Sequence, residues 1–133
     1  MIGSEPASLS ERLAAEIVRV SDRLRTLSLA RLSVPLPPYA SRAEAGRALA
    51  QRLADAAQGI EGRGSPEPPS WREVPRLGDV AAGDQVAVTG QDLLAALEAA
   101  DADTEVWTRT GRRLAREVAE DAEAALRDLR LAL

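Results

Sequence analysis

Arginine side chains in the last third of the chain are the residues best suited to bind a charged ligand. Arg109, Arg112, Arg113 and Arg116 follow one another at helical spacing, which would place four guanidinium groups along one ridge of a helix. Guanidinium groups bind phosphate and carboxylate oxygens through paired hydrogen bonds. The pattern therefore predicts a site for phosphate, nucleic acid or an acidic protein surface.

The same arginines also fit an ordinary solvent-exposed helix surface. Arg113 lies four residues before Glu117, and Arg116 lies four residues before Glu120, which is the usual spacing of ion pairs on a solvated helix. Positions 80–105 carry acidic residues and no basic one, so this neighbouring segment can neutralise the ridge. Both interpretations, an anion site and a solvated face, are open at the level of sequence.

A group of carboxylates in the last helical segment offers a second kind of chemistry. Helical enzymes that hydrolyse nucleotides hold Mg²⁺ with such side chains, but they need carboxylates from facing helices. The other helical segments carry only scattered acids, so a magnesium-dependent hydrolase is a remote alternative. The carboxylates concerned are Glu117, Glu120, Asp121 and Glu123.

The amino-acid composition of the chain excludes most of the common catalytic sites. It contains no His and no Cys, and all 17 of its basic residues are Arg. These absences exclude Ser–His and Cys–His nucleophile pairs, Schiff-base lysines and the common zinc sites. We therefore expect no enzymatic activity, no catalytic residue, no bound cofactor and no metal site.

Charge and hydropathy narrow the class of partner. The net charge is −4, which disfavours nucleic acid because general attraction to its phosphates needs a basic face. Mean hydropathy is −0.19, and no apolar run approaches the roughly 18 residues of a membrane span. With no export signal in the sequence, we expect a cytoplasmic protein, and its 133 residues suit one domain covering 1–133.

The first segment predicts a long helix over residues 9–32. Its apolar residues repeat at steps of three and four, which defines one buried face, and Pro35 ends it. Val18, Leu29 and Leu32 lie on a different side of this helix. They form either a second strip buried within the same bundle or a strip that contacts a partner subunit.

The middle of the chain predicts a linker, a helix and a long loop. Residues 34–40 are rich in proline and should be an extended linker. Ser41 and Glu44 form a capping box that opens a helix extending to about residue 60. The loop 61–79 combines glycine, proline and charge, and its Trp71 is either an anchor for a partner or a side chain that packs back onto the bundle.

The second half predicts a hairpin followed by two helices. Residues 77–81 and 85–89 should pair across a Gly-Asp turn, a short helix should follow over 89–100, and a longer one should begin near residue 104. The fold class is therefore mainly α, with about four helices packed as a bundle and a small β-hairpin between the second and third helices.

The prediction of function depends on the classes that the composition excludes. We expect a non-catalytic protein–protein interaction or assembly module, homo-oligomeric, whose partner is itself or another protein. The alternative is a regulatory domain that binds a small molecule or nucleotide through the arginine ridge.

Overall fold

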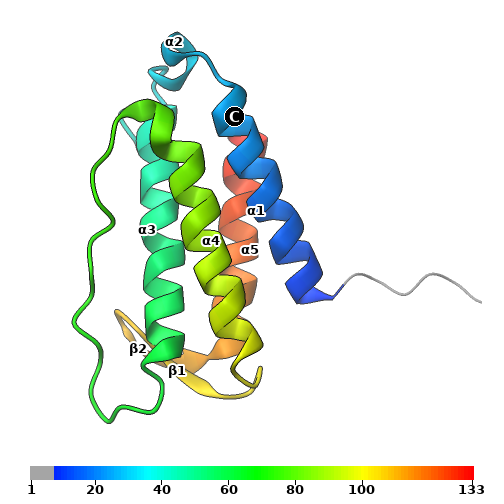
Figure 1. Ribbon diagram of the computed structural model, residues 1–133, viewed down its shortest axis with the longest axis vertical. Helices are drawn as coiled ribbons and strands as arrows, with labels where there is room; N and C mark the ends of the chain where they lie inside the picture. Colours follow the sequence, from blue (N-terminus) through cyan, green and yellow to red (C-terminus); the bar gives the residue numbers. More distant parts are fainter. Residues whose placement is uncertain (1–7) are drawn as a thin grey trace, which may run out of the picture.

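Four long helices lie side by side in the computed structural model, which describes residues 8–133 (Figure 1). α1 packs against α4 and α5, and α3 packs extensively against α4 and less closely against α5. The prediction of a mainly helical fold is confirmed. The long helices are α1 (Leu9–Thr26), α3 (Arg42–Glu61), α4 (Ala82–Glu98) and α5 (Ala115–Ala132), and the short ones are α2 (Leu29–Leu32) and η1 (Asp79–Ala81).

The predicted starts of the first two helices are confirmed by their caps. The hydroxyl oxygen of Ser8 accepts a hydrogen bond from the backbone N–H of Glu11, at 3.1 Å. Ser41 caps α3 in the same way, through the N–H of Glu44 at 3.1 Å. The Glu44 carboxylate accepts hydrogen bonds from Arg47 and Arg76, so it holds side chains together at the start of α3.

The prediction of one helix over 9–32 is wrong. α1 ends at Thr26 because Leu27 adopts an extended backbone and Ser28 caps the separate helix α2, accepting from the N–H of Arg31. Leu29 is 60% exposed on α2, whereas Leu32 turns inward and is only 2% exposed. Val18, exposed on α1, therefore shares no continuous strip with these two residues.

The proline-rich linker 34–40 turns back on itself where we expected an extended segment. The backbone N–H of Tyr39 donates to the carbonyl of Leu36 at 2.7 Å, and the N–H of Leu36 donates to the carbonyl of Tyr39 at 3.3 Å. These two bonds close a tight turn between α2 and α3.

The hairpin predicted over 77–89 is wrong, because most of this segment is helical. Ala82, Val86 and Leu93 fall on one helical face and are completely buried, which favours α4 over a pair of short strands. Thr89, the predicted start of a new helix, lies inside α4, and its hydroxyl donates to the carbonyl of Gln85 at 2.7 Å.

The two-stranded sheet lies instead between α4 and α5, where we expected the start of the last helix. Strands β1 (Glu105–Thr108) and β2 (Gly111–Leu114) pair in antiparallel register across a two-residue turn. Gly111 has a φ of 125°, a value that side-chain-bearing residues rarely adopt. Val106 is fully buried, so the hairpin closes one end of the bundle (Figure 1).

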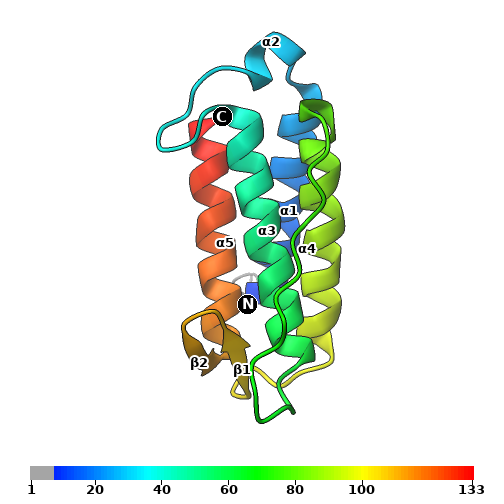
Figure 2. The same ribbon diagram turned by 90° about the vertical axis from the view of Figure 1, so that its left-hand side faces the viewer.

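Residues 62–78, which we call the strap and which lie within the predicted loop 61–79, contain no helix or strand. Figure 2 shows the strap crossing in front of α3 and α4 along much of their length. The side-chain amides of Gln51 and Gln58, on α3, each accept one backbone N–H of the strap and donate to one of its carbonyls. These bonds satisfy backbone groups that the lack of secondary structure would leave unpaired.

None of the helices within residues 8–133 combines the length and the apolar character that crossing a lipid bilayer requires.

Candidate functional site

The four arginines predicted to form one helical ridge lie on three different elements. Arg109 is in the turn of the hairpin, Arg112 and Arg113 are on β2, and Arg116 is in the first turn of α5. Neighbouring residues of a strand point to opposite faces, which separates Arg112 from Arg113. The four arginines therefore form no common ridge. Each of them instead binds other residues of the chain, as follows.

Arg109 and Arg112 hold the hairpin against α3 and the strap. Arg109 makes two hydrogen bonds to Asp55, at 2.6 and 3.0 Å, which are the main cause of its raised pKa. Its guanidinium also lies 5.3 Å from the centre of the Trp71 ring. Arg112 stacks over Trp107 at 4.2 Å and donates to the carbonyl of Ser65 at 2.8 Å.

Arg113 and Arg116 pair with carboxylates near the hairpin. Arg113 is hydrogen-bonded to Asp121 and lies 3.8 Å from a carboxylate oxygen of Glu117, while Arg116 is hydrogen-bonded to Asp103. An anion would therefore have to compete with an internal carboxylate at both positions.

Trp71 is half-buried on the strap, near Gly59 of α3. A ring atom lies 3.5 Å from the point where a side chain on Gly59 would begin, and Arg109 covers the ring. This arrangement supports the interpretation in which Trp71 ties the loop down onto the bundle.

Three of the four carboxylates considered for magnesium are engaged in local structure. Glu117 accepts from the backbone N–H of Leu114, Asp121 binds Arg113, and Glu123 lies 3.3 Å from Arg127. Within the part of the chain that the structure describes, no three acidic side chains are placed to hold one metal ion.

A groove that the sequence did not predict runs between α3, α4 and the strap. Its volume is about 460 Å³, which falls in the range of small-molecule sites. Val88 of α4, which is 62% exposed, and Leu77 of the strap bring large apolar side chains to its walls. The other apolar lining comes from Ala54, Ala57, Val74 and Pro75.

Gln85, on the α4 side of the groove, contributes a polar group that lacks a partner. The residue is only 7% exposed, and its side-chain Nε2 donates to the carbonyl of Pro75 at 2.6 Å. This bond fixes the orientation of the amide and leaves Oε1 buried with no hydrogen bond among the described residues. An unpaired buried acceptor typically costs about 1–3 kcal/mol, so a donor supplied by a ligand would stabilise this position.

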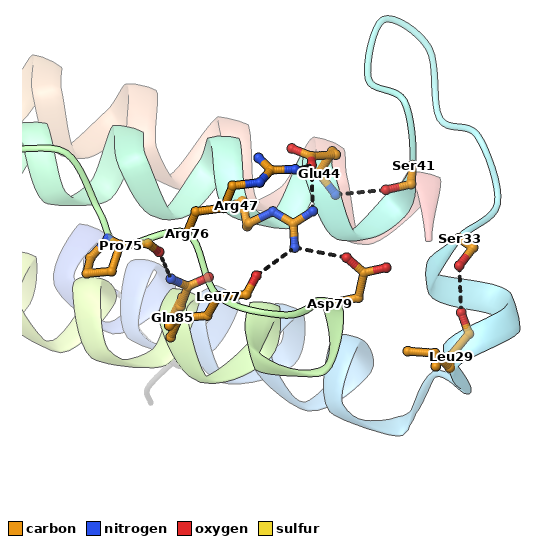
Figure 3. A network of polar contacts seen from close by, with 10 residues as sticks. All are labelled: Leu29, Ser33, Ser41, Glu44, Arg47, Pro75, Arg76, Leu77, Asp79 and Gln85. Carbon is orange, nitrogen blue, oxygen red and sulfur yellow. Dashed lines mark hydrogen bonds and ion pairs between the residues drawn. The ribbon is translucent and has the colours of Figure 1, made fainter.

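A cluster of charged side chains fastens the far end of the strap, as Figure 3 shows. The largely buried Arg47 of α3 donates to Glu44 at 2.6 Å, to Asp79 at 3.0 Å and to the carbonyl of Leu77 at 3.4 Å. Arg76 of the strap also binds Glu44. Hydrogen bonds from these two arginines lower the pKa of Glu44, and the bond from Arg47 has the larger effect. The strap is thus held as a wall of the groove from residue 70 to residue 77.

The rim of the groove is acidic. It carries Glu61, Glu73, Asp84 and Asp92, against the single guanidinium of Arg72. Asp84 is paired with Arg25 of α1 at 2.7 Å. Across residues 8–133, the other three rim carboxylates form no hydrogen bond and no ion pair, so they are available to a ligand.

Gln85, a single glutamine, gave no signal in the sequence. Two of the rim acids, Asp84 and Asp92, belong to the acidic segment 80–105, and Glu61 and Glu73 lie outside it. The chain matches no protein-family model, and no curated protein or solved structure is detectably similar to it.

Proposed function

We propose that this chain is a non-catalytic binding module that takes a small amphipathic molecule in the groove between α3, α4 and the strap. The observation that carries the proposal is the partnerless Oε1 of Gln85 beside an exposed apolar wall. The absence of His, Cys and Lys leaves this groove without the common nucleophile and base pairs. The side chains that line the groove are suited to binding a small molecule.

Two kinds of contact would provide affinity. The apolar part of a ligand would cover Val88 and Leu77, and burial of apolar surface contributes about 25 cal/mol per Å². A donor on the ligand would pair with Oε1 of Gln85, which is closed to solvent beneath the strap. Reaching it requires the strap to shift at Pro75, so binding and a movement of the strap are coupled.

Replacement of Val88 with glutamine tests the groove directly. We expect the Val88→Gln variant to bind 4-phenylbutan-1-ol, an uncharged amphipathic probe, about tenfold more weakly, because part of the apolar wall is lost. Affinity is measured by chemical-shift titration of the ¹⁵N-labelled protein. The matched control is Val18→Gln, because Val18 is also exposed but lies on α1, outside the groove.

Equal affinities of the two variants would place the probe elsewhere. Shifts confined to α3, α4 and the strap in the unaltered protein, weakened only by Val88→Gln, would support the proposal.

Self-association is a second candidate function, because two exposed apolar side chains lie on contacting elements at one end of the bundle. Leu29 of α2 is 60% exposed and Val80 of η1 is 69% exposed. We expect light scattering across a concentration series to give the mass of a dimer for the unaltered chain and of a monomer for the double variant Leu29→Glu, Val80→Glu. A monomer at every concentration of the unaltered chain would reject this candidate.

A further inference from the structure

The acidic rim identifies the class of ligand, an inference that rests on the proposed function of the groove. We propose that the groove binds an organic cation, with an ammonium or guanidinium group at the carboxylates and an apolar body on Val88 and its neighbours.

The first argument is the position of the charges on α4. Asp84, Val88 and Asp92 all line the groove and are spaced four residues apart, so they follow one another along one face of the helix. Asp84 and Asp92 are about 12 Å apart along the helix axis, at 1.5 Å per residue. A cation bound at either end would leave its apolar body lying on Val88.

The other two carboxylates come from different elements on the opposite side. Glu61 is the last residue of α3, and Glu73 is on the strap. Neither carboxylate has a hydrogen bond or ion pair among the described residues, although Glu73 is near enough to Arg109 to contribute to the raised pKa of that guanidinium. A cation would therefore break no direct contact at either carboxylate.

The second argument is the hydrogen-bonding capacity of the groove. Its unused polar atoms are mainly acceptors, namely the rim carboxylates and the buried Oε1 of Gln85. One of the two N–H groups of the Gln58 amide donates to the Ser70 carbonyl, and the Thr89 hydroxyl donates to the Gln85 carbonyl. An ammonium group, which has only donors, matches these acceptors, whereas a carboxylate or phosphate does not.

Among the residues that the structure describes, Arg72 is the one basic side chain that lines the groove, and it would be the contact for an anionic ligand. Arg25 neutralises Asp84, but the other three carboxylates outnumber the single guanidinium and leave the rim negative. The balance of charge therefore favours a cation.

A series of three probes with the same apolar body tests this inference. The full chain is titrated with 4-phenylbutan-1-amine, 4-phenylbutan-1-ol and 4-phenylbutanoate, and affinities are measured by ¹⁵N chemical-shift titration at low salt. We expect the amine to bind about tenfold more tightly than the alcohol and the carboxylate to bind most weakly. The preference should decrease as salt is added, because the rim is exposed to solvent.

The variant Asp92→Asn should weaken binding of the amine about threefold and leave binding of the alcohol unchanged. Its matched control is Glu98→Gln, since Glu98 is an exposed acid of the same helix that does not line the groove. A smaller preference for the amine over the alcohol in Asp92→Asn, but not in Glu98→Gln, supports the inference.

Equal affinities for all three probes, or tighter binding of the carboxylate, would overturn the cation assignment and leave the groove as a binding site. Failure of all three probes to bind would overturn the proposed function itself.

Discussion

Replacing Gly59 with alanine should destabilise the protein by about 3 kcal/mol or more, because the site has no room for a side chain. A Cβ atom on this residue would lie 1.9 Å from the backbone carbonyl oxygen of Trp107 and 2.9 Å from its carbon. Both obstacles are backbone atoms of β1, so no rotation of a side chain can relieve the contact. The hairpin would have to move away from α3.

The measurement is urea-induced unfolding, followed by the fluorescence of Trp71 and Trp107. Displacement of the hairpin should also expose Trp107, whose indole N–H donates to the Ser65 carbonyl at 3.0 Å, and shift its emission to longer wavelength. Gly64→Ala is the matched control, because nothing lies within 4 Å of a Cβ atom there. A stability of Gly59→Ala equal to that of this control would show that the hairpin does not pack as described.

Replacing Arg130 with methionine should lower the melting temperature by several degrees at neutral pH. Glu16 of α1 is 4% exposed, and Arg130 of α5 binds both of its oxygens, at 2.7 and 3.0 Å. Removing Arg130 leaves a buried carboxylate whose one remaining ion-pair partner among residues 8–133 is Arg19, at 3.1 Å. Breaking a buried pair from one side costs more than replacing both partners with apolar groups.

The double variant Glu16→Met, Arg130→Met is therefore expected to recover part of the lost stability. Calorimetry of the three proteins checks this order. If the double variant melted below Arg130→Met, the ion pair would not be the cause of the loss.

The same pair predicts a dependence on pH. Hydrogen bonds from Arg130 are the largest cause of the lowered pKa of Glu16, which lies below its ordinary value of 4.5. The stabilisation is present above the pKa of the unfolded chain and is lost as the pH falls through the lower folded-state pKa. The difference in melting temperature between the unaltered protein and Arg130→Met should thus be largest near pH 7 and should shrink below pH 4.5.

Local patterns predicted the elements whose stabilising contacts are near in sequence. The buried face of α1, with Leu13, Ile17, Val20 and Leu24, follows helical spacing, and Ser41 caps α3 through a residue three positions away. The errors arose where two local structures compete. Apolar and polar side chains alternate over residues 85–89 as in a strand, but burial of Val86 and Leu93 against the bundle favours a helix. Helical periodicity seemed to continue through Gly111, whose positive φ instead permits a hairpin.

The candidate site could not be predicted in the same way. Gln85 and Pro75 meet only because the strap returns along α3 and reaches α4, and the groove exists only between these three elements. The arginines illustrate the same limit, since Arg109 in the hairpin turn binds Asp55 of α3, which lies 54 residues earlier in the chain.

Composition and periodicity are local properties, so they are enough to give the chemical inventory of this protein and the apolar faces of its first two long helices. Which charged groups neutralise one another, and which stay free, depends on contacts between distant parts of the chain. Glu16 and Arg130 are 114 residues apart, and Arg47 and Asp79 are 32 apart, so their pairing depends on how the helices pack. The acidic, apolar-walled groove has the same origin, because the packing of α3, α4 and the strap brings distant residues to one surface.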